Sequence, residues 1–102
     1  MLSYLPCINF SNANLTSACL YFSHLEQASF RGANLENVNL SECDLSRADF
    51  TGANLKGADI GGSNLAGANL TGVTGLTDEQ LASAGGDSET KLPVDIKRPT
   101  GW

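Results

Sequence analysis

The feature that most constrains this chain is a five-residue repeat that runs through most of its length. Every fifth residue from Leu5 to Leu70 is large and apolar, which gives fourteen such positions without an insertion. The residue two places before each of them is small or of modest size. A period of five matches neither an α-helix, which repeats about every 3.6 residues, nor a β-strand, which repeats every second residue. The chain must therefore turn once per five residues and bury the same two positions each time, which makes a solenoid.

A third position of the repeat is polar. The residue just before the large one is Asn or Asp at ten of the thirteen positions from Asn9 to Asn69. Side chains of this kind bond the local backbone at turns. We therefore expect this column to be structural rather than a binding site. Its three exceptions are consecutive and are Cys19, His24 and Ser29.

The repeat unit Ala-Asn-Leu-x-Gly, as in Ala53–Gly57 and Ala68–Gly72, resembles the pentapeptide repeat family. The resemblance covers roughly residues 3–74 and implies an all-β solenoid, a right-handed quadrilateral β-helix with four pentapeptides per coil. Fourteen units then make about three and a half square coils. Residues 20 apart stack on one another in this arrangement, which puts Phe10, Phe30 and Phe50 in one interior column.

The register breaks at Gly75, and the sequence that follows indicates a cap. Thr77-Asp78-Glu79-Gln80 is typical of a capping box and predicts a short α-helix over 77–84. Residues 85–91 are polar and are predicted to be a linker. An extended tail follows. We expect it to fold back on the solenoid with Trp102 as its anchor, because it is more apolar than a flexible tail requires, and the alternative is a disordered tail.

The chain therefore divides into two parts. Residues 1–75 are predicted to be the pentapeptide-repeat β-solenoid, and residues 76–102 the C-terminal capping helix and tail.

Composition excludes several classes of protein. Eleven acidic residues against six basic ones give a net charge of −5, which argues against direct binding to nucleic acid. No stretch approaches the roughly 18 to 20 apolar residues of a membrane span. The first ten residues lack the pattern of a signal peptide. Three widely spaced cysteines form neither a disulfide framework nor a metal cluster, which favours free thiols and a cytoplasmic location.

One pair of side chains raises the question of catalysis. His24 precedes Asp44 by 20 residues in the same column, which resembles half of an acid–base pair. No nucleophilic Ser or oxyanion site is recognisable beside it, so we predict no catalytic residue and no enzyme activity. The spacing of His, Cys and carboxylates does not repeat, so we predict no metal ligand and no cofactor.

The irregular segment supplies the candidate site instead. Tyr21 and Phe22 fall at outward positions between Cys19 and His24. Exposed aromatic side chains next to each other on so small a domain are typical of an interaction surface. We take Cys19, Tyr21, Phe22 and His24 as a candidate protein-interaction patch. The alternative is sequence drift in a less regular first coil.

Two functions remain open. The first is a non-enzymatic structural or interaction protein that presents a rigid solenoid surface to a protein partner. The second is a DNA-mimicking modulator of a type II topoisomerase (DNA gyrase) of the quinolone-resistance type, which the family resemblance implies. Residues 1–75 carry six acids and three bases, a net charge of −3. Duplex DNA carries one charge per roughly 1.7 Å of its axis, so a convincing mimic requires more acidic groups.

The apolar residues at the N-terminal edge either fold over the first coil or pair with a second copy, and the family resemblance implies homodimers through a terminal face. The dimer contact is either the N-terminal edge, with Met1, Leu2, Tyr4 and Leu5, or the Tyr21/Phe22 patch.

Overall fold

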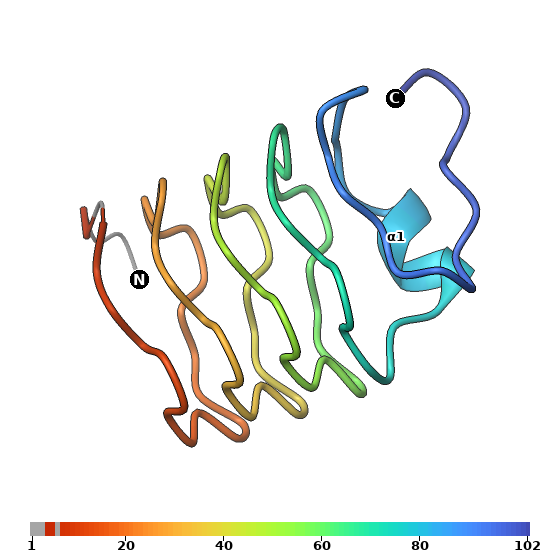
Figure 1. The fold of residues 1–102 in the computed structure, drawn as a ribbon. Helices are drawn as coiled ribbons and strands as arrows, with labels where there is room; N and C mark the ends of the chain where they lie inside the picture. Colours follow the sequence, from red (N-terminus) through yellow and green to blue (C-terminus); the bar gives the residue numbers. More distant parts are fainter. Residues whose placement is uncertain (1–3, 6) are drawn as a thin grey trace.

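The computed structural model describes residues 4, 5 and 7–102, and its backbone winds in stacked coils (Figure 1). The described part measures 30 × 21 × 19 Å. Its regular elements are parallel β-bridges of single residues and one short helix, α1 (Asp78–Ala82). Helix α1 lies at the end of the stack away from the first coil (Figure 1). No helix in this part of the chain is both long enough and apolar enough to cross a membrane.

The bridges set the size of one coil. They join residues 20 apart, from Tyr4 with His24 to Asn54 with Thr74, so one coil takes four pentapeptides. The phenylalanines 20 apart stack as expected, with ring centroids 5.5 Å apart between Phe10 and Phe30 and 4.9 Å between Phe30 and Phe50. The predicted grouping of the repeats is therefore confirmed.

The corners between faces share one backbone conformation. The second residue after each large one has a positive φ of 56° to 72°, at six glycines and at eight residues that carry side chains. Each of the ten Asn and Asp side chains accepts a hydrogen bond through Oδ1 from the backbone N–H two residues later. This confirms the structural role expected for the column, since the bond holds each turn closed.

The core lies inside the coils and is better covered in the middle than at the start. Inward side chains from Leu25 to Leu70 are almost completely buried. The corresponding side chains of the first coil are only partly buried, and they include Leu5, Ile8, Phe10, Leu15 and Leu20. Each coil is covered by its neighbours, so this side of the core carries less cover within the described residues.

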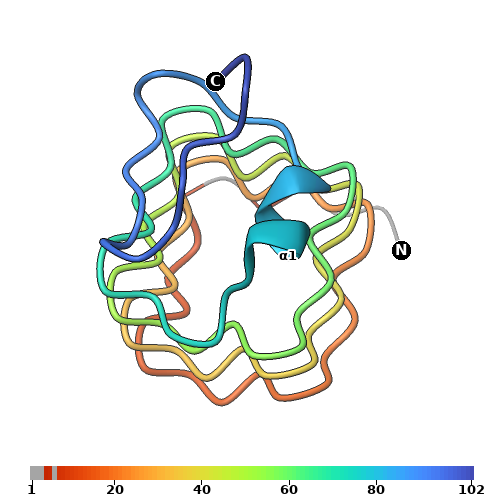
Figure 2. The same ribbon diagram turned by 90° about the vertical axis from the view of Figure 1, so that its right-hand side faces the viewer.

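Helix α1 lies across the other end of the coils (Figure 2). Its capping box is complete, because Thr77 Oγ1 accepts from Gln80 N–H and Gln80 Oε1 accepts from Thr77 N–H. Gln80 Nε2 also donates to the carbonyls of Leu55 and Ala58, at 3.1 and 2.9 Å. Leu81 is fully buried in the core. One turn of helix thus covers apolar side chains and binds two carbonyls of the last coil, of which Leu55 O also accepts from the N–H of Ala58.

The prediction of a polar linker over 85–91 is wrong. Gly85 forms a parallel bridge with Asn64, and Lys91 forms one with Asn69. The buried hydroxyl of Thr90 donates to the carbonyl of Leu65 at 2.8 Å. The polar sequence hid this role, because the segment pairs through its backbone with an edge that would otherwise be open.

The tail after segment 85–91 packs on the core. Leu92, Ile96 and Trp102 are partly buried against it. Trp102 lies so close to Gly86 that a Cβ there would be 2.5 Å from its Cε3 atom. Arg98 donates to the carbonyls of Asp87 and Thr90, both at 2.8 Å.

Candidate interaction surface

The four residues of the predicted patch lie around one corner of the solenoid. Cys19 is on one face, His24 is on the next, and Tyr21 and Phe22 form the corner between them. The two aromatic residues are 40% and 51% exposed. Their ring centroids are 5.7 Å apart at an interplanar angle of 36°. The structure thus brings the two rings together on the surface, with an exposed Cys19 thiol before them.

Phe22 is an unusual residue for its position. Its φ is 63°, a left-handed conformation that costs a non-glycine residue about 1–2 kcal/mol. The next coils have Glu42 and Gly62 at the same corner. The corner itself therefore does not require an aromatic side chain.

The same corner lacks a bond that the regular corners have. Cys19 has no oxygen with which to hold the N–H of Tyr21, whereas Asn39 and Asp59 hold the equivalent N–H groups in the next coils. The corner is held through the backbone, with Phe22 N–H donating to Ser41 O at 3.0 Å. The patch therefore lies at a corner that lacks the side-chain hydrogen bond found at the corresponding corners of the next coils.

His24 has neighbours that the sequence prediction did not include. Tyr4 is 71% exposed, and its ring meets the imidazole edge-on with centroids 5.8 Å apart. Glu26 places Oε1 at 3.4 Å from Nδ1 of His24. Tyr4 could have been found, because it lies 20 residues before His24 in one column. Glu26 could not, because the period does not indicate how a corner side chain folds back over a face.

A groove of about 760 Å³ runs along the next corner and was also missed. Tyr4 and Glu26 line one part of it, and Arg47, Asp87 and Lys91 line the rest. Asp87 accepts from the backbone N–H of Gly67 at 3.1 Å, and this hydrogen bond holds the pKa of Asp87 below its ordinary value. The groove depends on the segment 85–91 lying against the last coil, which the sequence did not indicate.

Comparison with known proteins was informative for solved structures, while the curated proteins gave no match. HetL, a pentapeptide repeat protein involved in heterocyst differentiation regulation from the cyanobacterium Nostoc sp. strain PCC 7120, is 28% identical with a TM-score of 0.69. The match covers 85% of this chain but only 42% of HetL. A pentapeptide repeat protein from the Arabidopsis thaliana thylakoid lumen is 25% identical with a TM-score of 0.57, over 96% of this chain and 70% of that one.

A third structure has the same fold at lower identity. QnrB1, a plasmid-mediated fluoroquinolone resistance protein, is 22% identical with a TM-score of 0.68. The match covers 87% of this chain and 46% of QnrB1. The family model for pentapeptide repeats matches residues 3–32 and 33–72, with eight copies. The chain thus belongs to the pentapeptide repeat family, and its fold is the right-handed β-helical solenoid of that family.

Proposed function

We propose that this protein is a non-enzymatic interaction protein whose solenoid presents the Tyr21/Phe22 corner to another protein. The observation that supports the proposal is the exposed aromatic pair. Phe22 keeps a large apolar side chain in a conformation that disfavours it, and 51% of that residue is exposed. A large apolar side chain that is half exposed in an unfavourable backbone conformation is better explained by a contact outside the chain.

The surroundings of the pair favour a particular kind of partner. Glu42 lies at the same corner as Phe22 in the next coil. Asp44 lies on the neighbouring face, and Glu26 lies at the corner after that face. An apolar centre with an acidic rim fits a protein surface that has an apolar pocket bordered by Lys or Arg. We propose a partner of this chemistry.

A second copy of the chain is the other partner we propose. Tyr4 is exposed and Leu5 and Phe10 are only partly buried, so the N-terminal end of the solenoid offers apolar surface to an equivalent end. Met1 and Leu2, which we expected at this edge, lie outside the described residues. We also propose that the chain divides into a solenoid of about three and a half coils over 1–75 and a cap over 76–102.

The test is the absolute mass in solution by light scattering, for wild type and for Tyr21→Ser/Phe22→Ser. Thr16→Ala/Ser17→Ala changes a different corner and is the matched control. A dimer that only the aromatic double variant breaks assigns the patch to self-association. A dimer that survives in both variants assigns the dimer contact to the N-terminal edge.

A monomeric wild type moves the test to a different partner protein. Proteins cross-linked to wild type are then compared with those cross-linked to Tyr21→Ser/Phe22→Ser. A partner lost only in the aromatic variant supports the proposal. Equal capture by both variants contradicts a role for the Tyr21/Phe22 patch.

A DNA-mimicking role at a type II topoisomerase is the second proposal, supported by the acidic net charge of −5. The likeness to QnrB1, at 22% identity, extends to the fold alone. The low charge of the solenoid weighs against this role, because a mimic must reproduce the phosphate charge. Gyrase supercoiling assayed with excess protein tests it, and unchanged supercoiling contradicts it.

We propose a reducing compartment such as the cytoplasm. Cys7 and Cys19 are exposed free thiols, and such thiols persist where the surroundings are reducing.

A further inference from the structure

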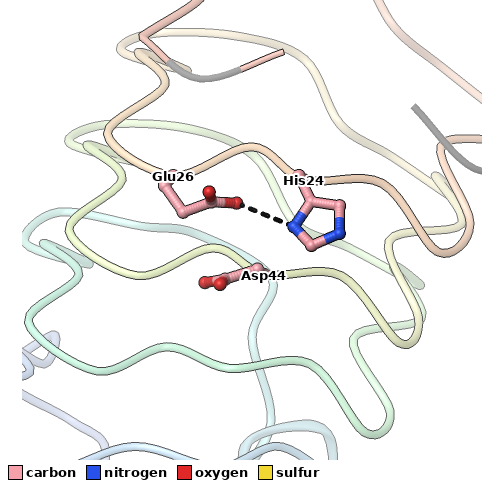
Figure 3. Close-up of side chains that lie close together, drawn as sticks. All are labelled: His24, Glu26 and Asp44. Atoms are coloured by element: carbon pink, nitrogen blue, oxygen red, sulfur yellow. Dashed lines mark ion pairs between the residues drawn. The ribbon is translucent and has the colours of Figure 1, made fainter. Parts of the chain in front are cut away.

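Three side chains that can bind a metal ion converge beside the aromatic corner (Figure 3). His24 and Asp44 belong to successive coils and are joined by a backbone bridge. Glu26 lies two residues after His24 and folds back toward it (Figure 3). One ligand atom from each residue lies within 4.8 Å of the other two.

The spacing of two of these atoms already suits a metal ion. His24 Nδ1 and Glu26 Oε1 are 3.4 Å apart. Two ligands about 2.0–2.1 Å from a tetrahedral Zn²⁺ lie about 3.3–3.4 Å from each other. The pair thus has the separation of two ligands of one zinc ion.

The oxygen atoms at the site have unused capacity. Glu26 Oε1 is buried from solvent and, apart from its 3.4 Å contact with His24 Nδ1, accepts no hydrogen bond from any described residue. A buried oxygen of this kind carries a desolvation penalty that a bound cation would offset. Asp44 uses Oδ1 for the N–H and hydroxyl of Ser46, at 3.1 and 2.8 Å, which leaves Oδ2 available.

His24 does not have the turn-closing role of the Asn and Asp residues at the same position of the repeat. The next two coils have Asp44 and Asn64 at this position, and both side chains close the following corner with a hydrogen bond. Among the described residues, His24 accepts no such bond from the N–H of Glu26, and its Nδ1 lies 3.4 Å from Glu26 Oε1 instead. Histidine in place of Asn or Asp at position 24 removes a turn contact and adds a nitrogen ligand near two carboxylates.

We propose that His24, Glu26 and Asp44 bind a divalent first-row transition-metal ion, for which Zn²⁺ is the probe. One imidazole and two carboxylates suit Zn²⁺ and ions of similar preference, and a fourth position remains for water. The side chains of His24 and Glu26 are 48% and 26% exposed, so the ion can enter from solvent. The ion would link two successive coils at the edge of the proposed interaction surface.

The experiment is a calorimetric titration of Zn²⁺ into tag-free protein in which Cys7→Ser/Cys19→Ser removes the two exposed thiols that also bind zinc. His24→Gln, Glu26→Gln and Asp44→Asn remove one ligand each. Asp49→Asn is the matched control, because it changes an Asp at the same position of the five-residue repeat, on the next face of the solenoid. Asp44→Asn retains the oxygen that closes the turn, so it tests the ligand without removing the corner bond.

We expect one Zn²⁺ per chain, an affinity at least about tenfold lower in each of the three ligand variants, and no change in Asp49→Asn. His24 is the single histidine, so its imidazole signals in ¹H–¹⁵N NMR spectra report directly whether Nδ1 is bound. Wild-type affinity in His24→Gln and Asp44→Asn, or imidazole signals unmoved by zinc, would overturn the proposal and leave a surface ion pair only. This outcome is independent of partner binding, which is tested without added metal.

Discussion

At the scale of single residues, the corners reveal where this solenoid favours stability and where it does not. The left-handed corner position holds Gly in six places and Asn in two, both of which tolerate a positive φ. Phe22 tolerates it poorly and gains little burial in return. Because half of the side chain is exposed, contacts inside the chain offset only part of the free energy that the positive φ of Phe22 costs.

Phe22→Asn tests this directly. We expect the free energy of unfolding to rise by about 1 kcal/mol, because Asn adopts the left-handed conformation more easily than Phe. Urea unfolding followed by circular dichroism measures the change. Tyr21→Asn is the control, because φ of Tyr21 is not positive, and it should bring no such gain. A less stable Phe22→Asn protein would mean that the phenyl ring supports the fold.

A second residue-scale prediction concerns Asp49. Burial alone would raise its pKa, but hydrogen bonds from the hydroxyl and N–H of Thr51, together with Arg31 at 3.4 Å, lower the pKa below its ordinary value of 3.8. A group whose pKa is lower in the folded state stabilises the protein above its unfolded pKa. That stability is lost as the pH falls through the folded value.

We therefore expect Asp49→Asn to narrow the difference in unfolding free energy between pH 7 and pH 3, as measured by urea unfolding at both values. Asn keeps the oxygen that binds Thr51, so the turn survives. Asp59→Asn, at a position with no ion pair among the described residues, is the control. An equal narrowing in both variants would rule out a special contribution from Asp49.

At the scale of elements, helix α1 is too short to be stable alone and depends on what it covers. Isolated helices below about 12–15 residues are marginal in water, and α1 (Asp78–Ala82) has five residues. Its stability must come from the buried Leu81 and from the two bonds that Gln80 donates to the last coil. The capping box sets where the helix begins, and contacts with the solenoid hold it there.

Gln80→Glu separates these two contributions. Glu can still accept from the N–H of Thr77, so the capping box remains, and it suits the first turn of a helix. It cannot donate to the carbonyls of Leu55 and Ala58, so we expect a loss of about 1–3 kcal/mol in unfolding free energy at neutral pH. Thermal unfolding of Gln80→Glu beside wild type measures it, and equal stability would show that the two bonds contribute nothing.

At the scale of the whole molecule, the two ends of the solenoid are covered differently. Leu81, Thr90 and Trp102 cover or pair with the last coil. The inward residues of the first coil are only partly buried among the described residues. In a solenoid each coil is stabilised by its immediate neighbours, so protection should follow this gradient.

Hydrogen exchange tests this gradient residue by residue. The backbone amides of Leu5, Phe10, Leu15 and Leu20 should exchange faster than those of Leu40, Leu45, Phe50 and Leu55, although each of these amides donates to the next coil. The difference should shrink if a second copy covers the N-terminal end, so exchange is measured at low and high protein concentration. Uniform protection would mean that the solenoid opens as one cooperative unit.

The sequence by itself determined the five-residue solenoid turn and the start of α1, and the family resemblance added the stacking of residues 20 apart. These depend on short-range rules, because a strict period places the same side chain inside at every turn. The stacking of Phe10, Phe30 and Phe50 was expected from the four-unit coil that the family resemblance implies, and their spacing of 20 residues agrees with it. The exposed pair of Tyr21 and Phe22 was readable from the five-residue period.

Only the tertiary structure decided how residues outside the period are used. Segment 85–91 pairs with the last coil because an open backbone edge binds whatever chain lies beside it, and polar side chains do not prevent this. Glu26 meets His24 and Asp44 because a flexible corner side chain folds back over a face, which no spacing specifies. The candidate metal site and the groove both depend on such contacts between residues whose positions follow from packing rather than from the repeat.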